Sequence, residues 1–380
     1  MTSRSVKRRR RGLPGPLQDA EQRPHLVLMV DDGTPGGIRR SVEYLVAEWR
    51  TSDGTPEVDR IALRGAGSLA AAVPVFLSSL ARTAVRMVWR RPSVVHINVT
   101  QRGSTARALA IVALARAGGV PTIIHLHSSE YRAFVETAPA PAVALIRWMF
   151  NAASRVLVLG DGWADYVHTA LRVPHDRLLV VPNAVPGPGD AELQWNNGEP
   201  RLLFLGQLGR RKGVPDLIEA LGRPQVAALP WQAVLAGDGD PTLYREQARQ
   251  LQIEDRIHFC GWIETAEVRR QLLQADVLTL PSHAEGLPLA VLEGLAYRLA
   301  VVATPVGAVA EVIRDGETGL LTPPGDVDAL AAALSAVLAD RAQRERLAAN
   351  GREAWEAAHD ITVYARRMTE LYDEMTAGGR

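Results

Sequence analysis

Two glutamates, Glu285 and Glu293, lie eight positions apart in the stretch EGLPLAVLEGLA. Apolar residues 277–282 predict a strand before them, and a helix is predicted to follow with Pro288 in its first turn, where a missing N–H costs nothing. The first N–H groups of such a helix have no partner within it and point toward an anion. A diphosphate at this point would have a carboxylate on either side, ready to accept hydrogen bonds from sugar hydroxyls. The pattern therefore indicates a phosphorylated sugar ligand.

A basic cluster, Arg210, Arg211 and Lys212, follows a second predicted strand at 201–206. The chain holds 41 arginines but only two lysines, of which one, Lys7, lies near the N-terminus. A lone lysine within a folded domain of so Arg-rich a chain indicates that a compact ammonium group is needed there. We interpret the cluster as a diphosphate clamp at a helix start. The alternative is a solvated run of charge.

The first predicted strand, 25–30, is followed by DDGTPGGIRR. Gly36 and Gly37 would let the backbone approach a phosphate or a sugar closely, although an ordinary turn that needs positive φ explains glycines equally well. The segment lacks the G-x-G-x-x-G spacing of a dinucleotide-binding loop.

Two histidines, His125 and His127, alternate along the predicted strand 122–127. We expect them to face opposite sides of the sheet, so that only one lines a cleft. The carboxyl end of the strand favours His127 for that role, and His125 is expected to be packed. The alternative is that both are structural.

Other strand ends carry weaker signals. Asp238 and Asp240 alternate without further metal ligands, so we interpret them as turn residues and expect no metal site. Trp262 could border a base or belong to a core.

Apolar, β-rich runs alternate with helical patterns along the whole chain, which favours parallel sheets covered by helices on both faces. Ligands of such sheets bind beyond the carboxyl ends of the strands. The runs form two series: 25–30, 60–63, 94–99, 122–127, 155–160 and 178–183, then 201–206, 232–237, 256–261, 277–282 and 300–305.

We predict the following division of the chain, in which the linker is the Pro-, Gly- and Asn-rich stretch between the two series. It consists of a basic disordered tail (1–23), a first domain (24–185), a linker (186–199), a second domain (200–355) and a C-terminal helix (356–380).

Composition narrows the class. The chain has 380 residues, of which 47% are hydrophobic and 22% charged, as in a soluble globular protein. Its single cysteine excludes an internal disulfide and favours a reducing compartment. No run is long enough to span a bilayer, and no apolar signal core follows the basic start. We therefore expect a cytoplasmic protein.

The net charge of +1 is unevenly distributed along the chain. Residues 1–185 carry 24 Lys+Arg and 14 Asp+Glu, a net charge of +10, and the rest of the chain carries the offsetting negative charge. Six of the positive charges lie in 4–11, which favours a solvated tail, and we expect no nucleic-acid partner. Residues 76–91 predict a helix with Arg82, Arg86 and Arg90 on one face. That face could bind an anionic membrane surface, or the helix could be an ordinary packed one.

The order and spacing of these motifs resemble family 4 glycosyltransferases over most of residues 24–380. The resemblance lies in PSHAEGLPLAVLEGLA with its E-x7-E pattern, RRKG, VVPNAVP and ATPVGAVAEVIRDGETGLL. It implies a GT-B fold of the α/β class, in which two Rossmann-like, doubly wound parallel-sheet domains face each other across a cleft. The first domain (24–185) would then be the acceptor-side domain and the second (200–355) the nucleotide-sugar-binding domain, with the C-terminal helix (356–380) packing back on the first. It also implies sugar transfer from a nucleotide donor with retention of configuration, without a bound metal or other cofactor.

The resemblance implies a role for each matching residue. Glu293 would bind the ribose hydroxyls, and Glu285 with the amides of Gly286 and Leu287 would bind the donor hexose. Lys212 would hold the diphosphate, and His127 would hydrogen-bond the transferred sugar. Gly36 and Gly37 would allow the backbone to approach the donor phosphate or the acceptor closely. Gln207 departs from the pattern because the family commonly has arginine there, and Arg210 or Arg211 is expected to replace that charge.

We therefore predict a retaining hexosyltransferase that acts from a nucleoside diphosphate donor on a hydroxyl of a lipid-linked saccharide, a polysaccharide precursor or a small metabolite. It is expected in the cytoplasm, with the inner face of the plasma membrane as a further partner. Two alternatives stay open: a non-catalytic nucleotide-sugar-binding subunit, which Gln207 permits, and a sugar-nucleotide epimerase of similar architecture.

Overall fold

The computed structural model describes residues 25–33, 36–52, 54–64, 69–193, 195 and 198–377, without the side chains of 69–71 and 191. The predicted tail, 1–23, lies outside the described residues. Within the described part, no helix combines the length and the apolar character that crossing a bilayer requires.

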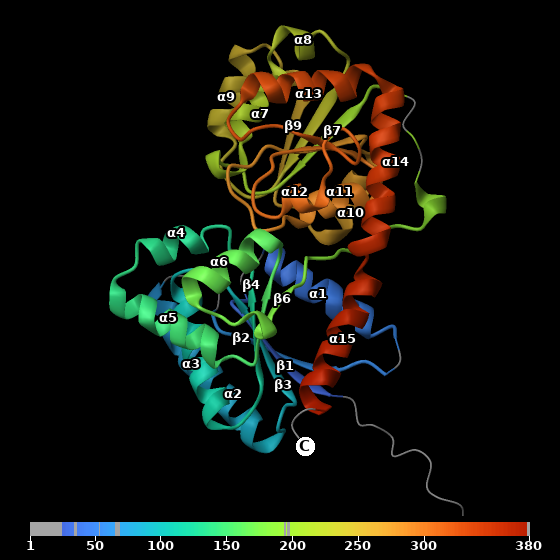
Figure 1. The fold of residues 1–380 in the computed structure, drawn as a ribbon. Helices are drawn as coiled ribbons and strands as arrows, with labels where there is room; N and C mark the ends of the chain where they lie inside the picture. The colour runs from blue at the N-terminus through green and yellow to red at the C-terminus, as the bar shows by residue number, and fades with distance from the viewer. Residues whose placement is uncertain are drawn as a thin grey trace, which may run out of the picture.

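Two parallel six-stranded sheets form the chain's two lobes (Figure 1). The first has the order β2-β1-β3-β4-β5-β6 and the second β12-β11-β10-β7-β8-β9. The predicted α/β class with two doubly wound parallel sheets is confirmed. The first sheet comprises β1 (Leu26–Asp31), β2 (Glu57–Ala62), β3 (Val94–Val99), β4 (Thr122–Leu126), β5 (Arg155–Val158) and β6 (Leu178–Val180). The second comprises β7 (Arg201–Leu205), β8 (Gln232–Ala236), β9 (Ile257–Gly261), β10 (Val277–Leu280), β11 (Ala300–Ala303) and β12 (Leu320–Leu321).

Each of the eleven predicted strands has a counterpart within a few residues of its expected place. The sequence patterns missed β12, which is two residues long and too short to show any periodicity.

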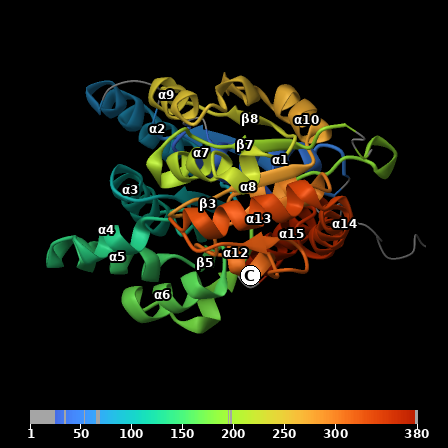
Figure 2. The same cartoon turned by 90° about the horizontal axis from the view of Figure 1, so that it is seen from above.

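Helices cover both faces of both sheets. In the first lobe they are α1 (Gly37–Trp49), α2 (Leu69–Trp89), α3 (Gly103–Ala117), α4 (Tyr131–Glu136), α5 (Ala140–Ala152) and α6 (Asp161–Leu171). The rest are α7 (Val214–Leu221), α8 (Pro224–Ala227), α9 (Thr242–Gln250), α10 (Thr265–Gln274), α11 (Leu289–Ala296), α12 (Val309–Val312), α13 (Val327–Ala339), α14 (Arg341–Ala358) and α15 (Ile361–Ala377). Seen from above, α4, α5 and α6 project beyond the second lobe (Figure 2).

The last helix, α15, completes the first lobe. One face of β1 packs with α2, α3 and α5, whereas the other face, with Val27 and Met29, packs with α1 and α15. Trp49 Nε1 of α1 donates to the carbonyl oxygen of Ala365 at 3.3 Å and lies 3.1 Å from Thr369 Oγ1, so the two helices are joined side by side (Figure 1). Alternate residues of β1 thus pack in two separate apolar clusters, as expected for a strand that is buried on both faces.

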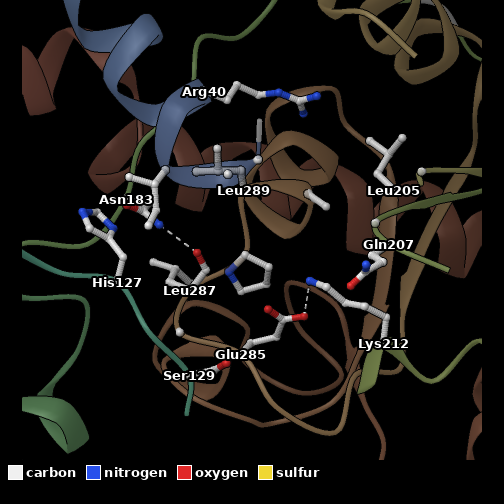
Figure 3. Close-up of a pocket in the computed structure, with 18 of the residues that line it drawn as sticks. Arg40, His127, Ser129, Asn183, Leu205, Gln207, Lys212, Glu285, Leu287 and Leu289 are labelled. Carbon is white, nitrogen blue, oxygen red and sulfur yellow. Dashed lines mark hydrogen bonds and ion pairs between the residues drawn. The ribbon is translucent and has the colours of Figure 1, made fainter. Parts of the chain in front are cut away.

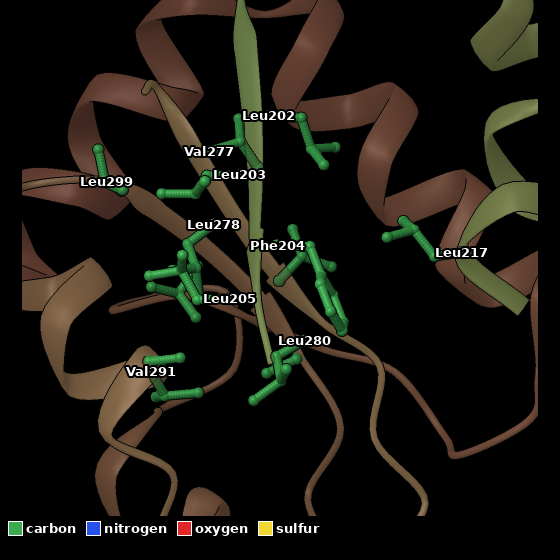
Figure 4. Packing of buried hydrophobic residues seen from close by; sticks show 14 of the residues in the cluster. Leu202, Leu203, Phe204, Leu205, Leu217, Val277, Leu278, Leu280, Val291 and Leu299 are labelled. Atoms are coloured by element: carbon green, nitrogen blue, oxygen red, sulfur yellow. The ribbon is translucent and has the colours of Figure 1, made fainter. Parts of the chain in front are cut away.

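The core of the second lobe follows the same alternation (Figure 4). Leu203 and Leu205 of β7 lie on the side of Val291 in α11, while Phe204 lies on the side of Leu217 in α7. Because α11 is buried along its whole length, it is held firmly against β10 and β11. Any side chain that α11 turns toward the cleft is therefore fixed in place.

The arginines of α2 have partners within the first lobe. Arg86 and Arg90 form ion pairs of 2.7 Å with Asp59 and Glu57 of β2, so two of the three arginines are bound to carboxylates of their own lobe. The sequence did not reveal these partners, which support the alternative of an ordinary packed helix, while binding of α2 to a membrane stays a prediction. The strongly exposed apolar side chains of the helix are Val73, Leu77, Val85, Val88 and Trp89.

In each sheet the chain first adds strands on one side of a strand and then on the other, which creates a topological switch point. In the second sheet, the chain leaves β7 toward β8 and later returns on its other side at β10. In the first sheet, β1 lies between β2 and β3. Ligands of open parallel sheets bind at such points, beyond the carboxyl ends of the strands.

Candidate active site

A cleft of about 830 Å³ lies between the lobes, lined by loops from both switch points (Figure 3). The first lobe contributes the start of α1, the loop after β3 and residues 127–130 after β4. The second contributes the loops after β7, β8, β9 and β10 and the start of α11. Nine of the ten predicted site residues line this cleft: Gly36, Gly37, His127, Arg211, Lys212, Glu285, Gly286, Leu287 and Glu293.

Arg210 is the predicted site residue that does not line the cleft, and its side chain is exposed. Residues 210–212 form one turn of 3₁₀ helix, which sends successive side chains in different directions. Arg211 lines the cleft and donates from Nη1 to the carbonyl oxygen of Ala284 at 3.3 Å. Of the two candidates to replace the charge missing at Gln207, only Arg211 therefore faces the ligand space.

Lys212 forms an ion pair with Glu285, at 2.5 Å from Nζ to Oε1. The sequence placed these two side chains on different parts of the ligand, whereas here they bind each other. Gly213, with φ of 69°, permits this approach, since a Cβ there would lie 1.9 Å from the carbonyl oxygen of Pro281. The loops after β7 and β10 are thus in direct backbone contact.

The turn that carries Glu285 and Gly286 rests on the loop after β11. Gly307, with φ of 62°, leaves no room for a side chain, because a Cβ would lie 2.2 Å from the carbonyl oxygen of Glu285. The next amide, of Ala308, donates to the carbonyl oxygen of Gly286 at 2.8 Å. Pro288 then forms the N-cap of α11, one residue before the position that the sequence suggested. The backbone around both predicted sugar-binding amides is therefore fixed.

Glu293 of α11 is 2% exposed and is contacted from the opposite lobe. Tyr44 Oη donates to its Oε1 at 2.8 Å, and Arg40 Nη1 lies 3.2 Å from Oε1 and 3.4 Å from Oε2. Burial, followed by the nearby charge of Glu293, raises the pKa of Tyr44. The carboxylate expected to bind ribose is thus already engaged by α1.

Sequence reasoning missed both Arg40 and Tyr44. The available signal was their spacing, because Gly37, Arg40 and Tyr44 are three and four residues apart on a predicted helix and so lie on one face.

His127 is held as one tautomer. Asn98 Nδ2 donates to the carbonyl oxygen of Val30 at 3.4 Å, which turns its Oδ1 toward His127 Nε2 at 2.9 Å. Since Oδ1 can only accept, Nε2 carries the proton and Nδ1 keeps its lone pair. Burial lowers the pKa of His127 to about 3, so the ring is neutral near pH 7. The uncharged ring can therefore accept a hydrogen bond from a hydroxyl through Nδ1.

His125 corrects one expectation. Residues two apart in a strand lie on the same face, so the prediction that His125 and His127 face opposite sides was wrong. Their ring centroids are 4.0 Å apart, and His96 of the neighbouring strand lies 5.4 Å from His125. His125 is nevertheless buried, as expected. It supports the inner side of His127 and does not line the cleft.

The remaining candidates lie as follows. Asp240 accepts hydrogen bonds from the backbone N–H and the hydroxyl of Thr242, as a turn residue does, and Asp238 lines the cleft. Trp262 also lines the cleft and is 50% exposed, so it is not part of the core. Over the described residues, no group of three His, Cys, Asp or Glu side chains is arranged to hold a metal ion.

Two family models match the chain. The glycosyl transferase 4-like domain matches residues 17–184, and the model of glycosyl transferases group 1 matches residues 190–354. The chain is 30% identical over 292 residues to alpha-maltose-1-phosphate synthase from Mycolicibacterium smegmatis, which covers 68% of this chain and 74% of that protein. The chain belongs to the family 4 glycosyltransferases.

Further similarities agree with this assignment. Alpha-D-kanosaminyltransferase from Streptomyces kanamyceticus is 28% identical over 293 residues, which span 72% of this chain and 75% of the relative. The crystal structure of HepE from Anabaena in complex with UDP-glucose superposes with a TM-score of 0.69 at 18% identity, covering 92% of this chain and 99% of that one. The fold of this glycosyltransferase is therefore GT-B.

Further contacts join the two lobes of the glycosyltransferase. Asn183 Nδ2 donates to the carbonyl oxygen of Leu287 at 2.8 Å, next to the predicted sugar-binding amides. Farther out, Glu311 Oε2 accepts a hydrogen bond of 2.8 Å from the backbone N–H of Asp161 at the start of α6. A Cβ at Gly160 would lie 2.6 Å from this carboxylate. These contacts hold the lobes close together.

Proposed function

We propose that this glycosyltransferase moves a hexose from a nucleoside diphosphate sugar to an acceptor hydroxyl, with retention of anomeric configuration. The observation that carries the proposal is the meeting, in one cleft, of Lys212, the first turn of α1 and the glutamates Glu285 and Glu293. The cationic group and the free N–H groups suit a diphosphate, and the carboxylates suit sugar hydroxyls.

Charge builds on the leaving diphosphate as the bond from the anomeric carbon to its oxygen breaks. Lys212 and the first N–H groups of α1 would stabilise that charge as it develops, which is usually the largest catalytic contribution. Glu285, paired with Lys212, would accept hydrogen bonds from the sugar hydroxyls. Neutral His127 would accept a hydrogen bond from a sugar hydroxyl through Nδ1. The acceptor hydroxyl would attack from the face that the diphosphate leaves, and its proton would pass to an oxygen of that diphosphate.

The acceptor would enter from the first lobe. The cleft there is lined by hydroxyl, amide and carboxylate groups of Thr100, Gln101, Ser128, Ser129 and Glu130. Gln101 Nε2 donates to Glu130 Oε2 at 2.9 Å, and Ser128 contacts the same amide side chain. Such groups hydrogen-bond well to hydroxyls, which supports a saccharide, a lipid-linked saccharide or a small polyhydroxylated metabolite as the acceptor.

We also propose that the enzyme works in the cytoplasm as a peripheral membrane protein. The supporting feature is the apolar surface of α2, in which Val73, Leu77 and Val85 lie at multiples of four residues. Trp89 at its C-terminal end is 83% exposed, and Arg82 and Arg91 beside this surface are also exposed. An apolar surface edged by tryptophan and arginine suits the boundary of an anionic bilayer.

Flotation with vesicles that contain anionic lipid tests this surface. The variant Leu77→Glu/Val88→Glu should stay with the unbound fraction, because two charges would have to enter the acyl boundary. Arg86→Gln, which removes an arginine bound to Asp59, should float about as well as the wild type. Equal flotation of wild type and the double variant would exclude the surface.

A thermal-shift screen of UDP-, GDP-, ADP- and dTDP-sugars tests the proposed donor class. A ligand at one hundred times its Kd should stabilise the folded protein by about 2.7 kcal/mol. The stabilising donor is then incubated with and without candidate acceptors. Transfer supports the proposal, whereas conversion of the donor to another sugar nucleotide without an acceptor would identify an epimerase. Binding without turnover would instead indicate a non-catalytic subunit.

A further inference from the structure

Gln207 stands where the family resemblance implies an arginine, so the proposed diphosphate site has one positive charge fewer than that resemblance implies. Gln207 lies at the carboxyl end of β7, lines the cleft and is exposed. The cationic side chains among the described residues that line the cleft are Arg40, Arg211 and Lys212. Arg40 comes from the first lobe, three residues beyond Gly37, and no sequence pattern identified it as a donor ligand.

Arg40 is bound to a carboxylate that the donor is expected to need. Its Nη1 lies 3.2 and 3.4 Å from the two oxygens of Glu293, and Tyr44 donates to the same carboxylate. A carboxylate offers about four lone-pair positions in all. A ribose with two hydroxyls therefore competes directly with α1 for Glu293, whose side chain is only 2% exposed.

An Arg40 released from Glu293 would stay inside the cleft. Its Cα lies in the first turn of α1, whose free N–H groups at Gly37 and Ile38 face the ligand space. In the close-up, its side chain extends over the cleft toward the side where Leu205 and Gln207 lie (Figure 3). A guanidinium offers five donors in a fixed plane and binds phosphate through two of them at once.

The space beside Arg40 is open. A Cβ built at Gly36 or Gly37 would meet no described atom within 4 Å, so the start of α1 borders unfilled volume. The helix start and the guanidinium would then act on the same anion, one through backbone dipoles and the other through a full charge.

We propose that Arg40 is a ligand of the donor diphosphate that supplies, from the opposite lobe, the charge that glutamine at position 207 lacks. When the donor binds, the ribose hydroxyls bind the carboxylate of Glu293. Arg40 then moves from that carboxylate to the diphosphate. Lys212 and Arg40 then hold the same group from two lobes, which couples donor binding to closure of the cleft. This inference rests on the proposed nucleotide-sugar function.

A purely structural role for Arg40 predicts the opposite change in nucleotide affinity. If its contact with Glu293 only ties the lobes together, then Arg40 competes with the donor and contributes nothing to binding it. Removing the guanidinium would free Glu293 and tighten nucleotide binding. The sign of the change in affinity therefore separates the two roles.

Isothermal titration of the full chain with UDP, GDP, ADP and inorganic pyrophosphate tests the proposal. Arg40→Gln should weaken binding of whichever diphosphate the wild type binds by at least about tenfold, since a charge-assisted phosphate contact is lost. The matched nucleoside monophosphate should lose less. Arg39→Gln removes the same charge one residue away, from an exposed pair with Glu43, and serves as the control.

A compensating variant makes the test independent of any loss of folding. Gln207→Arg in the Arg40→Gln background should restore most of the lost affinity, because it returns the charge from the second lobe. Unchanged or tighter binding by Arg40→Gln would overturn the role of Arg40, as would equal losses for Arg39→Gln and Arg40→Gln. A wild type that binds none of the four probes would instead overturn the proposed function itself.

Discussion

The Nζ atom of Lys212 lies 2.5 Å from Oε1 of Glu285, and the two side chains are only 14% and 8% exposed. The pair joins the cation proposed to hold the diphosphate to the carboxylate proposed to hold the hexose. A donor bound across both would have its reacting bond beside this contact. The pair therefore affects the stability of the cleft as well as its chemistry.

Removing one member of this pair should reduce both stability and activity. Lys212→Ala leaves Glu285 charged and largely buried without its partner, which should lower the free energy of unfolding by about 2–3 kcal/mol. Urea unfolding measures this loss. The double variant Lys212→Ala/Glu285→Ala should recover part of the stability but no transferase activity, and a double variant no more stable than the single one would contradict the account.

Gly37→Ala should impair donor binding without destabilising the protein. Gly37 opens α1 with no described atom within 4 Å of a Cβ position, and alanine is a better helix former than glycine. The methyl group would enter the space expected for the diphosphate. We expect the KM for the donor to rise about tenfold or more while the melting temperature is unchanged or higher. An unchanged KM would place the diphosphate elsewhere.

The tautomer of His127 can be measured directly. Long-range ¹H–¹⁵N correlation spectra should show the proton on Nε2, because Nε2 donates to Asn98 Oδ1. Asn98→Ala removes that acceptor and should lower kcat/KM by about tenfold, the equivalent of one hydrogen bond. A proton on Nδ1 in the wild type would refute the proposed contact between this nitrogen and a sugar hydroxyl.

The buried histidines should make folding sensitive to mild acid. Burial lowers the pKa of His96 to about 3, well under its unfolded value near 6.5, so below pH 6.5 the unfolded chain binds a proton that the folded chain does not. Stability therefore falls as pH falls through this range. Between pH 7 and pH 5 the contribution of His96 is a loss of about 2 kcal/mol.

Denaturant unfolding at pH 7 and pH 5 checks this effect with His96→Leu. The variant loses the hydrogen bond of 2.8 Å between His96 Nδ1 and Tyr372 Oη and should be less stable at pH 7. Its further loss between the two pH values should be smaller than that of the wild type by about 2 kcal/mol. Parallel losses in both proteins would count against the pKa assigned to His96.

The contact of Glu311 with α6 should keep the lobes together during turnover. Glu311→Gln removes a negative charge from a helix N-terminus, worth about 0.3–1 kcal/mol at such a site. We expect a larger radius of gyration by small-angle X-ray scattering with nucleoside diphosphate present, and more donor hydrolysis for each transfer. Glu317→Gln, in an exposed pair with Arg314, is the control. If both variants behave as the wild type does, the contact has no role in closure.

Much of the fold was predictable because its strands are short apolar runs separated by clear turn residues. The strand-end position of Lys212, Glu285 and His127 followed from the same pattern, since parallel sheets bring the ends of their strands to one edge. Local sequence thus identified nine of the residues that line the cleft.

What the sequence could not provide was pairing over long distances. Arg40 and Glu293 are 253 positions apart, and no local pattern indicates that α1 covers the carboxylate of α11. The carboxylates that bind Arg86 and Arg90 lie on a neighbouring strand, so only the tertiary structure showed that the exposed surface of α2 is apolar. His125 differs, because its error came from misapplying the two-residue period of a strand.

The central claim is sugar transfer by this chain with retention of configuration. The most direct measurement incubates the purified protein with the donor found by thermal shift and a hydroxylated acceptor, and follows product and nucleoside diphosphate by ¹H NMR. The account predicts equal amounts of both, a product with the anomeric configuration of the donor, and no turnover by Lys212→Ala. An inverted anomeric centre, or full activity of Lys212→Ala, would contradict it.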